Sequence, residues 1–327
     1  MKRNILEKKI QKNFSIIIPS KRIDKYLIKC IQKIKSFYPK IEIILMLDDT
    51  DNINSEIRSY NNIIILKSKK KNIAFKRNFA AKKTKKIFLV FIDSDAFPTH
   101  HWLNYYYDKI LKNKIVGGPN ISYTTNEEQK LVAKSRLLSV TSLNTNYKKK
   151  SNKIFNVNFL PACNLAVEKK LYLKLGGMNE NVITGEENSF YQKLKKKGIK
   201  ILMVGRGYVM HQERNIMEFL YQRMSYGSSI IAVFIDSPNF MILAALISSF
   251  NLVYLLLILI MSIIQIKFLF LLIPLVFLSA FITLNISKNN LFKSFIVSMI
   301  IIFGQSLGFL ISFFGFRNFY KLYKHNK

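Results

Sequence analysis

Cysteine and tryptophan are almost absent from this sequence of 327 residues. The two cysteines, Cys30 and Cys163, have no paired spacing, so the sequence indicates neither a zinc site nor a disulfide framework. This pattern fits a domain in a reducing compartment. The single tryptophan is Trp102, which leaves the rest of the chain without this residue.

Acidic residues are also scarce. The chain has 51 lysines and arginines against 19 aspartates and glutamates, a formal net charge of +32. Such a charge attracts nucleic acids and anionic lipid headgroups alike. Lysine, asparagine and isoleucine are over-used in every part of the chain, however, as expected from an AT-rich genome rather than from a nucleic-acid interface. We therefore predict membrane lipids as partners and no nucleic acid.

No acidic residue follows Asp236. Long apolar runs near 239–265, 268–287 and 294–316 are each long enough to cross a hydrocarbon core of ~30 Å. The sequence thus predicts an α-helical, multi-pass membrane region over 231–327, with about three transmembrane helices. The apolar run before Pro19 is too short and lies too late for a signal peptide, so residues 1–230 are expected in the cytoplasm.

The arrangement of the membrane region stays open at this stage. Three spans would place the basic tail, with Arg317 and Lys321, outside the cell, against the positive-inside tendency. Two spans and one re-entrant or interfacial segment would keep the tail in the cytoplasm. A helix expected from about Asn215 to Ile231 mixes arginines with apolar residues and suits the membrane surface, although an ordinary domain helix can have the same pattern.

The first part of the chain alternates apolar strands with helical segments. Nearly continuous apolar runs at 14–18, 41–47, 63–66 and 87–92 predict buried strands, and segments with helical spacing lie between them. This order predicts an α/β fold with a mostly parallel sheet and helices on both faces.

Two aspartates, Asp93 and Asp95, follow the apolar run 87–92 directly. Ligands of open α/β sheets bind beyond the carboxyl ends of the strands, and two carboxylates there can hold a hard divalent cation against phosphate oxygens. Aspartates are also common at ordinary strand ends and turns, so the pattern alone is weak.

Nine segments in order make the chain resemble the inverting family 2 glycosyltransferases with the GT-A fold. They are SIIIPS (15–20), Asp48-Asp49, FKRNFAA (75–81), FIDSDAFPTHHWL (91–103), VGGP (116–119), LPACNLAV (160–167), LGGMNE (175–180), GEENSF (185–190) and YVMHQE (208–213). The resemblance covers roughly residues 13–230 and implies transfer of a sugar from a nucleotide-sugar donor.

The resemblance also implies roles for single residues at the donor site. Pro19 and Ser20 would lie against the nucleotide base, Asp49 would accept a hydrogen bond from the base, and Arg77 would lie near the donor phosphates. Thr50-Asp51-Asn52 and Lys76 depart from the small residues that the family has at these positions, which affects the contacts to the base and the ribose.

For the metal, the resemblance implies that Asp95 is a direct ligand and His211 a further ligand. Asp93 would contact the ribose or a metal-bound water. Oxygen ligands suit Mg²⁺ or Mn²⁺, and one imidazole favours Mn²⁺ slightly. Without the resemblance, a lone histidine such as His211 is more often a surface or capping residue.

The catalytic base is expected in GEENSF, where Glu186 and Glu187 would lie in the first turn of a helix. The family has an aspartate at the position of Glu187, which would take the proton of the acceptor hydroxyl. Both glutamates could instead only complement the helix dipole. Asn164 is expected to face the acceptor.

These expectations define the leading function, a membrane-anchored inverting glycosyltransferase that moves one sugar to a lipid-linked or cell-surface glycan. Processive synthases of sugar polymers carry Gln-x-x-Arg-Trp after the catalytic domain, and no tryptophan follows Trp102 here. A polyprenyl-phosphate sugar synthase is an alternative. So is a catalytically degenerate protein that binds a nucleotide sugar without turnover.

Overall fold

The computed structural model describes residues 2–49, 55–138 and 152–315, which form two compact units. The first comprises the described residues within Met1–Tyr123, Asn144–Glu180 and Glu186–Gln212. The second comprises those within Thr124–Leu143, Asn181–Gly185 and Glu213–Lys327. The predicted departure at Thr50-Asp51-Asn52 and the basic tail after Gly315 lie outside the described residues.

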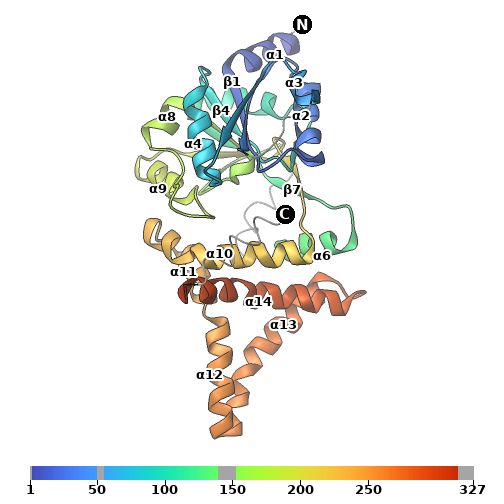
Figure 1. The fold of residues 1–327 in the computed structure, drawn as a ribbon, viewed down its shortest axis with the longest axis vertical. Helices are drawn as coiled ribbons and strands as arrows, with labels where there is room; N and C mark the ends of the chain where they lie inside the picture. The colour runs from blue at the N-terminus through green and yellow to red at the C-terminus, as the bar shows by residue number, and fades with distance from the viewer. Residues whose placement is uncertain (1, 50–54, 139–151, 316–327) are drawn as a thin grey trace. The chain divides into compact units, whose positions relative to one another are not determined.

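An eight-stranded sheet forms the centre of the first unit, in the order β3-β2-β1-β4-β9-β6-β10-β8 (Figure 1). Strands β3, β2, β1 and β4 are parallel to one another, β6 is parallel to β10, and β9 and β8 run antiparallel to their neighbours. The bounds are β1 Phe14–Pro19, β2 Glu42–Asp48, β3 Ile63–Ser68, β4 Phe88–Phe91, β6 Ile115–Gly117, β8 Ile154–Val157, β9 Leu165–Glu168 and β10 Ile201–Val204.

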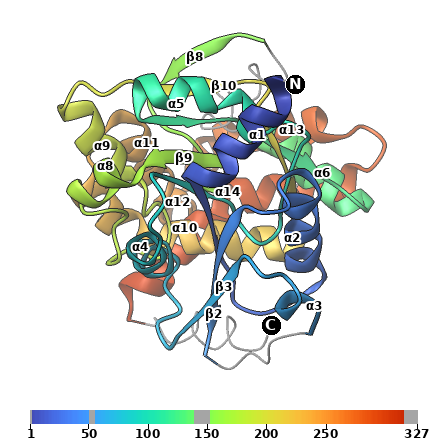
Figure 2. The same ribbon diagram turned by 90° about the horizontal axis from the view of Figure 1, so that it is seen from above.

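Two apolar cores cover the two faces of this sheet, because successive side chains of a strand point to opposite faces. Ile16 and Ile18 of β1 belong to one core, whereas Ile17 belongs to the other. Figure 2 shows the helices on both sides of the sheet. The helices of this unit are α1 Lys2–Asn13, α2 Lys25–Phe37, α3 Ser55–Arg58, α4 Ile73–Lys83, η1 Leu103–Tyr105, α5 Tyr107–Asn113, η2 Ala162–Asn164, α8 Lys169–Lys174 and α9 Asn188–Lys196.

A second, smaller sheet begins with the strand that follows β4 in the chain. It has the order β5-β11-β7, with β5 at Ala96–Pro98, β7 at Asn120–Tyr123 and β11 at Val209–Gln212. Strand β11 pairs antiparallel with β5, and His211 lies opposite Ala96. The backbone N–H of Gln212 donates to the Asp95 carbonyl at 2.9 Å. This pairing brings the last strand of the domain next to the end of β4.

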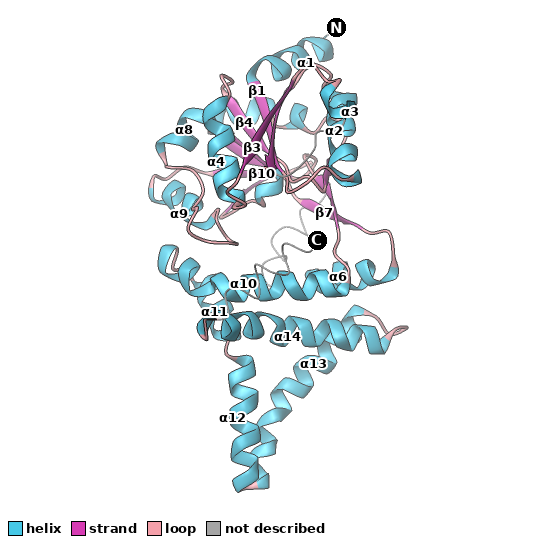
Figure 3. Cartoon of the chain, viewed as in Figure 1, coloured by secondary structure: helices cyan, strands magenta, loops and turns pink. Residues whose placement is uncertain are grey.

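The second unit is helical in its described residues (Figure 3). Its helices are α6 Glu127–Leu137, α10 Ile216–Asp236, α11 Phe240–Ser248, α12 Asn251–Ile264, η3 Ile266–Leu272, α13 Ile273–Ile286 and α14 Leu291–Phe313. Three stretches are long and apolar enough to cross a membrane, namely Phe240–Ile264, Ile266–Ile286 and Leu291–Phe313. They indicate membrane association and match the predicted apolar runs.

The structure confirms the predicted α/β class, the mostly parallel sheet with helices on both faces and the helical region after it. Residue 230, the predicted end of the first domain, lies inside α10, and the functional division at this point stays a prediction. Helix α9 begins at Asn188 rather than at Glu186, so both glutamates precede the helix, with Glu187 at the N-cap position.

Candidate active site

The candidate site lies at the carboxyl ends of β1, β2 and β4, where the parallel strands place their following residues at one edge of the sheet. Ser20 follows β1, Asp49 follows β2, and Asp93 comes two residues after the end of β4. Ser20 is buried and its backbone N–H donates to the Met46 carbonyl, whereas Asp49 is exposed. The sequence-predicted residues around the nucleotide base are thus on neighbouring strand ends.

Arg77 of α4 lies between two carboxylates. Its Nη2 donates to Asp93 Oδ1 and its Nη1 to Glu186 Oε1, each at 2.6 Å. The arginine side chain is 2% exposed. Burial alone would lower the pKa of Arg77, but the charges of Asp93 and Glu186 raise it above its ordinary value. In the structure, Arg77 therefore fixes the two carboxylates relative to each other, while its predicted contact to the donor phosphates stays a prediction.

Asp93 is held as a carboxylate by its neighbours. Burial would raise its pKa, but the Arg77 guanidinium and the hydrogen bond from His211 hold this pKa well below its usual range. An ionised carboxylate at this position can accept hydrogen bonds or bind a cation.

His211 faces both aspartates. Its Nε2 lies 3.4 Å from Asp95 Oδ1 and 3.8 Å from Asp93 Oδ2. Its Nδ1 lies 3.0 Å from the Gln212 carbonyl oxygen, which orients the ring. The antiparallel pairing of β11 with β5 explains this arrangement, because His211 is opposite Ala96 and Asp95 precedes Ala96 in the chain.

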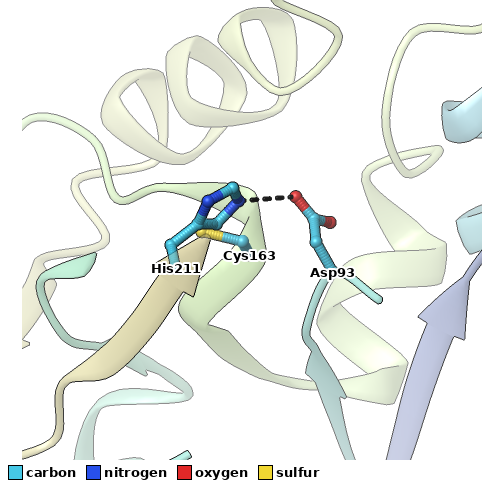
Figure 4. A group of neighbouring side chains, drawn as sticks. All are labelled: Asp93, Cys163 and His211. Atoms are coloured by element: carbon cyan, nitrogen blue, oxygen red, sulfur yellow. Dashed lines mark ion pairs between the residues drawn. The ribbon is translucent and has the colours of Figure 1, made fainter. Parts of the chain in front are cut away.

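Cys163 of η2 is a further member of this group. One oxygen of Asp93, the sulfur of Cys163 and one ring nitrogen of His211 lie within 4.8 Å of one another. Figure 4 shows these three side chains together. Burial and the negative charges of Asp93 and Asp95 raise the pKa of the Cys163 thiol well above its usual value. The thiol is therefore neutral at physiological pH unless a metal displaces its proton.

These residues fit a divalent metal. The carboxylates of Asp93 and Asp95 are oxygen donors suited to Mg²⁺ or Mn²⁺, and the imidazole of His211 favours Mn²⁺ over Mg²⁺. The sulfur of Cys163 adds a soft donor, which suits Zn²⁺ better than either.

The two glutamates of the predicted catalytic turn have different surroundings. Glu186 is buried and paired with Arg77, whereas Glu187 is half-buried. Burial, and then the charge of Glu186, raise the pKa of Glu187 to about 8. A carboxylate with a raised pKa is a stronger base and suits proton abstraction near neutral pH. Glu186 is thus engaged by Arg77, and the assignment of Glu187 as the base stays a prediction.

Asn78 of α4 holds the turn at Met178, whose neighbour Asn179 donates its backbone N–H to the Glu186 carbonyl at 2.9 Å. The Asn78 Oδ1 accepts from the Met178 backbone N–H and the Tyr172 hydroxyl, and its Nδ2 donates to the Met178 carbonyl and to Glu180. Gly177, at φ +69°, leaves room for the Asn78 side chain, since a Cβ there would lie 2.3 Å from the Asn78 Oδ1. The glycines of LGGMNE thus allow α4 to approach this turn closely.

Lys76 forms a second buried ion pair at the edge of the donor site. Its Nζ lies 2.6 Å from Asp48 Oδ1 and also donates to the Ser20 carbonyl. The side chains of Lys76 and Asp48 are only 3% and 9% exposed. The lysine therefore ties the ends of β1 and β2 together, which the sequence alone did not indicate.

Asn164, which is expected to face the acceptor, is enclosed by the protein. Its side chain is fully buried. Its Oδ1 accepts from Trp102 Nε1 and the Tyr106 hydroxyl, and its Nδ2 donates to the Pro119 and Gly207 carbonyls. All of its hydrogen-bonding capacity is used within the protein. Asn164 thus links these loops, and its expected role toward the acceptor stays a prediction.

Sequence reasoning also missed Cys163, because spacing rules for metal sites read ligands along the chain. Asp93, Cys163 and His211 come from three separate segments that only the sheet brings together. The only indication in the sequence was that Cys163 lies in the segment LPACNLAV, directly before Asn164.

The fold and the site define an α/β domain with a carboxylate and imidazole centre beyond the carboxyl ends of its parallel strands. Residues 15–176 match the model of glycosyl transferase family 2, which identifies this part of the chain as a domain of that family. No curated protein matches the sequence.

Similar solved structures include GalNAc-T7 with UDP, GalNAc and Mn²⁺, with 15% identity and a TM-score of 0.49. This match covers 67% of the present chain and 50% of GalNAc-T7. A second is S. aureus TarS 1–349 in complex with UDP-GlcNAc, with 15% identity, a TM-score of 0.47, and coverage of 67% of this chain and 66% of TarS. The present chain spans about half the length of the first and less than two thirds of the length of the second.

Proposed function

We propose that the protein is a membrane-associated, inverting glycosyltransferase that transfers a single sugar from a nucleoside diphosphate sugar to a lipid-linked or cell-surface glycan. The observation that carries this proposal is the position of Asp93 in two adjacent groups. Through Arg77, Asp93 is linked to the turn of Glu186 and Glu187, and it also lies beside His211 and Cys163. One buried arginine therefore links the proposed donor site to the proposed base.

In the proposed reaction, the acceptor hydroxyl attacks the anomeric carbon of the donor from the side opposite the diphosphate, which inverts the configuration. Glu187 accepts the proton of that hydroxyl. Glu186 and Arg77 hold the turn of Glu187 in place. A divalent metal held by Asp95 and His211, with Asp93, would stabilise the negative charge of the departing diphosphate.

The catalytic domain is proposed to lie in the cytoplasm, where nucleotide sugars are made, and the apolar helices of the second unit would anchor it. Three stretches with the length and apolar character of membrane spans support anchoring. An anchored enzyme suits an acceptor that is itself held in the membrane by a lipid.

The test is the binding of nucleoside diphosphates and their sugar conjugates to the detergent-solubilised protein, with and without Mn²⁺. Wild type, Asp95→Ala and the exposed Asp108→Ala on α5 would be compared by calorimetry. Metal-dependent binding of one nucleotide, lost in Asp95→Ala and kept in Asp108→Ala, is the expected result. Absence of binding for every nucleotide in the wild type would contradict the proposal.

Two further measurements separate the alternatives. Slow release of free sugar from the bound donor distinguishes an enzyme from a degenerate binding protein, which would bind the donor and leave it intact. A polyprenyl phosphate acceptor is already ionised and needs little help from a base, so full activity of Glu187→Gln would favour a polyprenyl-phosphate sugar synthase.

A further inference from the structure

The third apolar helix of the second unit, α14, differs from the other two in its surroundings. In the most apolar stretch of α14, 56% of the residues are buried within the protein. The corresponding shares are 17% for Phe240–Ile264 and 22% for Ile266–Ile286. A helix that crosses a bilayer alone presents most of its surface to lipid. Whether α14 can cross the membrane therefore depends on the helices that pack against it.

Helix α10 runs beside α14 in the same direction. Leu220 packs against Gly304, and Met224 packs against Gly308. Further along, the Ser312 hydroxyl donates to the Ser228 carbonyl. The residue numbers of the two helices rise together along the contact, so the helices are parallel. Figures 1 and 3 show the two helices side by side. Whatever depth α14 has in a membrane, α10 must share.

Glycines allow the backbones of these two helices to touch. A Cβ on Gly308 would lie 1.9 Å from the Met224 carbonyl oxygen, and one on Gly227 would lie 1.8 Å from the Gln305 carbonyl oxygen. Small residues spaced four apart, as Gly304 and Gly308 are, are typical of such close helix pairs. The contact is therefore a specific one along the length of both helices.

The partners of α14 carry charge along that length. Arg223 in α10 donates to the Gln305 side chain, and α10 also contains Glu218 in its first turn and Asp236 at its end. Near the start of α14, Glu128 of α6 lies 3.8 Å from Lys293. If α14 crossed the bilayer, these charged residues would be carried into the hydrocarbon core, where such groups are strongly disfavoured.

Helices α12 and α13 form a hairpin whose two legs meet α14 at the same end of the hairpin. Asn251 and Leu252, at the start of α12, hydrogen-bond to Ile302 and Ser306. At the end of α13, Thr283 donates to the Ser298 hydroxyl, and the Ser294 hydroxyl donates to the Ser287 carbonyl. Helix α14 therefore lies across the base of the hairpin and not along its legs.

The tip of the hairpin is apolar and free of this packing. Ile263, Ile266 and Phe270 are each more than 70% exposed around the turn into η3. Each leg has 14 residues, or about 21 Å of helix, and the 7 residues of η3 at the turn extend the hairpin further into a hydrocarbon core of ~30 Å. Lys267, at this turn, can extend its ammonium group to the far interface.

We propose that the α12–α13 hairpin is the membrane-inserted part of the described chain, and that α14 lies with α10 in the plane of the membrane interface. The lipid bilayer is the partner of this surface. Residues before α11 and after α14 are then on the same side of the membrane. Two crossings would also satisfy the positive-inside tendency for the basic residues of the sequence after Gly315.

The proposal is independent of catalysis and is tested by topology. The full chain would carry one epitope tag before Met1 and a different one after Lys327, in right-side-out and in inverted membrane vesicles from a bacterial expression host. Protease should remove both tags in the same vesicle preparation. Removal of the two tags in opposite preparations, as three crossings require, would overturn the proposal.

A second variant locates the hairpin. Lys267→Cys would be treated with a membrane-impermeant maleimide in both preparations, and the unaltered protein, whose Cys30 and Cys163 are buried, is the control. Labelling from the side opposite to the tags, or from neither side, fits an inserted hairpin. Labelling from the side of the tags would show that the hairpin does not enter the bilayer and would also overturn the proposal.

Discussion

Arg77 Nη2 donates to Asp93 Oδ1 at 2.6 Å in a position where the arginine side chain is almost fully enclosed. The same guanidinium pairs with Glu186, so one positive charge balances two carboxylates. Loss of one partner from a buried ion pair leaves an uncompensated charge, which commonly costs about 3–5 kcal/mol.

We therefore expect Arg77→Met to lower the stability of the protein by roughly 3–5 kcal/mol. The control is Arg22→Met, because Arg22 is 58% exposed and lies 3.9 Å from Asp24, and such surface pairs contribute about 0–1 kcal/mol. Thermal unfolding of the detergent-solubilised proteins measures both. Equal unfolding midpoints for the two variants would contradict the role assigned to Arg77.

The pH dependence of activity should report the ionisation of Glu187. Its pKa is raised to about 8 by burial and by Glu186, so the base is protonated and inactive below that value. We expect kcat/KM to rise with pH and to level off above the pKa of the free enzyme, which a positive metal ion would move downward.

The matched variants for this profile are Glu187→Gln and Glu127→Gln, since Glu127 is exposed on α6. Loss of the base should lower kcat by roughly 10²–10⁴-fold and remove the rise with pH. Glu127→Gln should keep the wild-type profile. A rise that persists in Glu187→Gln would assign the ionisation to another group.

Cys163 should influence which metal the site prefers. Its sulfur lies with Asp93 and His211 in one group, and thiolates bind Zn²⁺ and Cd²⁺ far better than they bind Mg²⁺ or Mn²⁺. We expect chelation to abolish activity and Mn²⁺ to restore it. Cys163→Ser should weaken Cd²⁺ binding by about tenfold or more and leave the response to Mn²⁺ nearly unchanged.

Calorimetric titration with Cd²⁺ and Mn²⁺ separates this effect from a general loss of structure. Cys30→Ser is the matched control, because Cys30 is also buried but its sulfur contacts the backbone carbonyl of Asp93 and is not one of the three grouped ligand atoms. If Cys163→Ser and Cys30→Ser bind Cd²⁺ equally well, Cys163 has no part in the metal site.

The sequence predicted the ends of the strands well, because an apolar run and the residues that follow it are local features. The proximity of His211 to Asp95 was expected only from the family resemblance, and the pairing of β11 with β5 supplies its physical cause. The roles of Arg77, Asn164 and Lys76 could not be predicted, because each depends on partners brought together from distant segments. Burial of a polar side chain, as for Asn164, is decided by that packing and not by its own residue type.

Lys76 should support the donor site through Asp48. Lys76→Met keeps most of the volume but leaves the buried Asp48 carboxylate unpaired, and it removes the donor to the Ser20 carbonyl. We expect a lower unfolding temperature and a higher KM for the donor with a smaller change in kcat. The double variant Lys76→Met with Asp48→Asn should recover much of the stability, because no buried charge is then left unpaired. Failure of the double variant to recover would show that the pair is not the source of the effect.

Gly227→Ala tests the close packing of α10 on α14, because the packing and the intrinsic helix preference predict stability changes of opposite sign. In an exposed helix interior, alanine is more stable than glycine by about 0.5–1 kcal/mol. Here a Cβ would lie 1.8 Å from the Gln305 carbonyl oxygen, and the backbone of α14 cannot move away without losing its packing. Gly227→Ala is therefore expected to destabilise the protein by about 1–3 kcal/mol, against the intrinsic preference. Ala232→Gly on the exposed part of the same helix should follow that preference and cost up to about 1 kcal/mol. A higher unfolding temperature for Gly227→Ala would mean that the two helices do not pack at this distance.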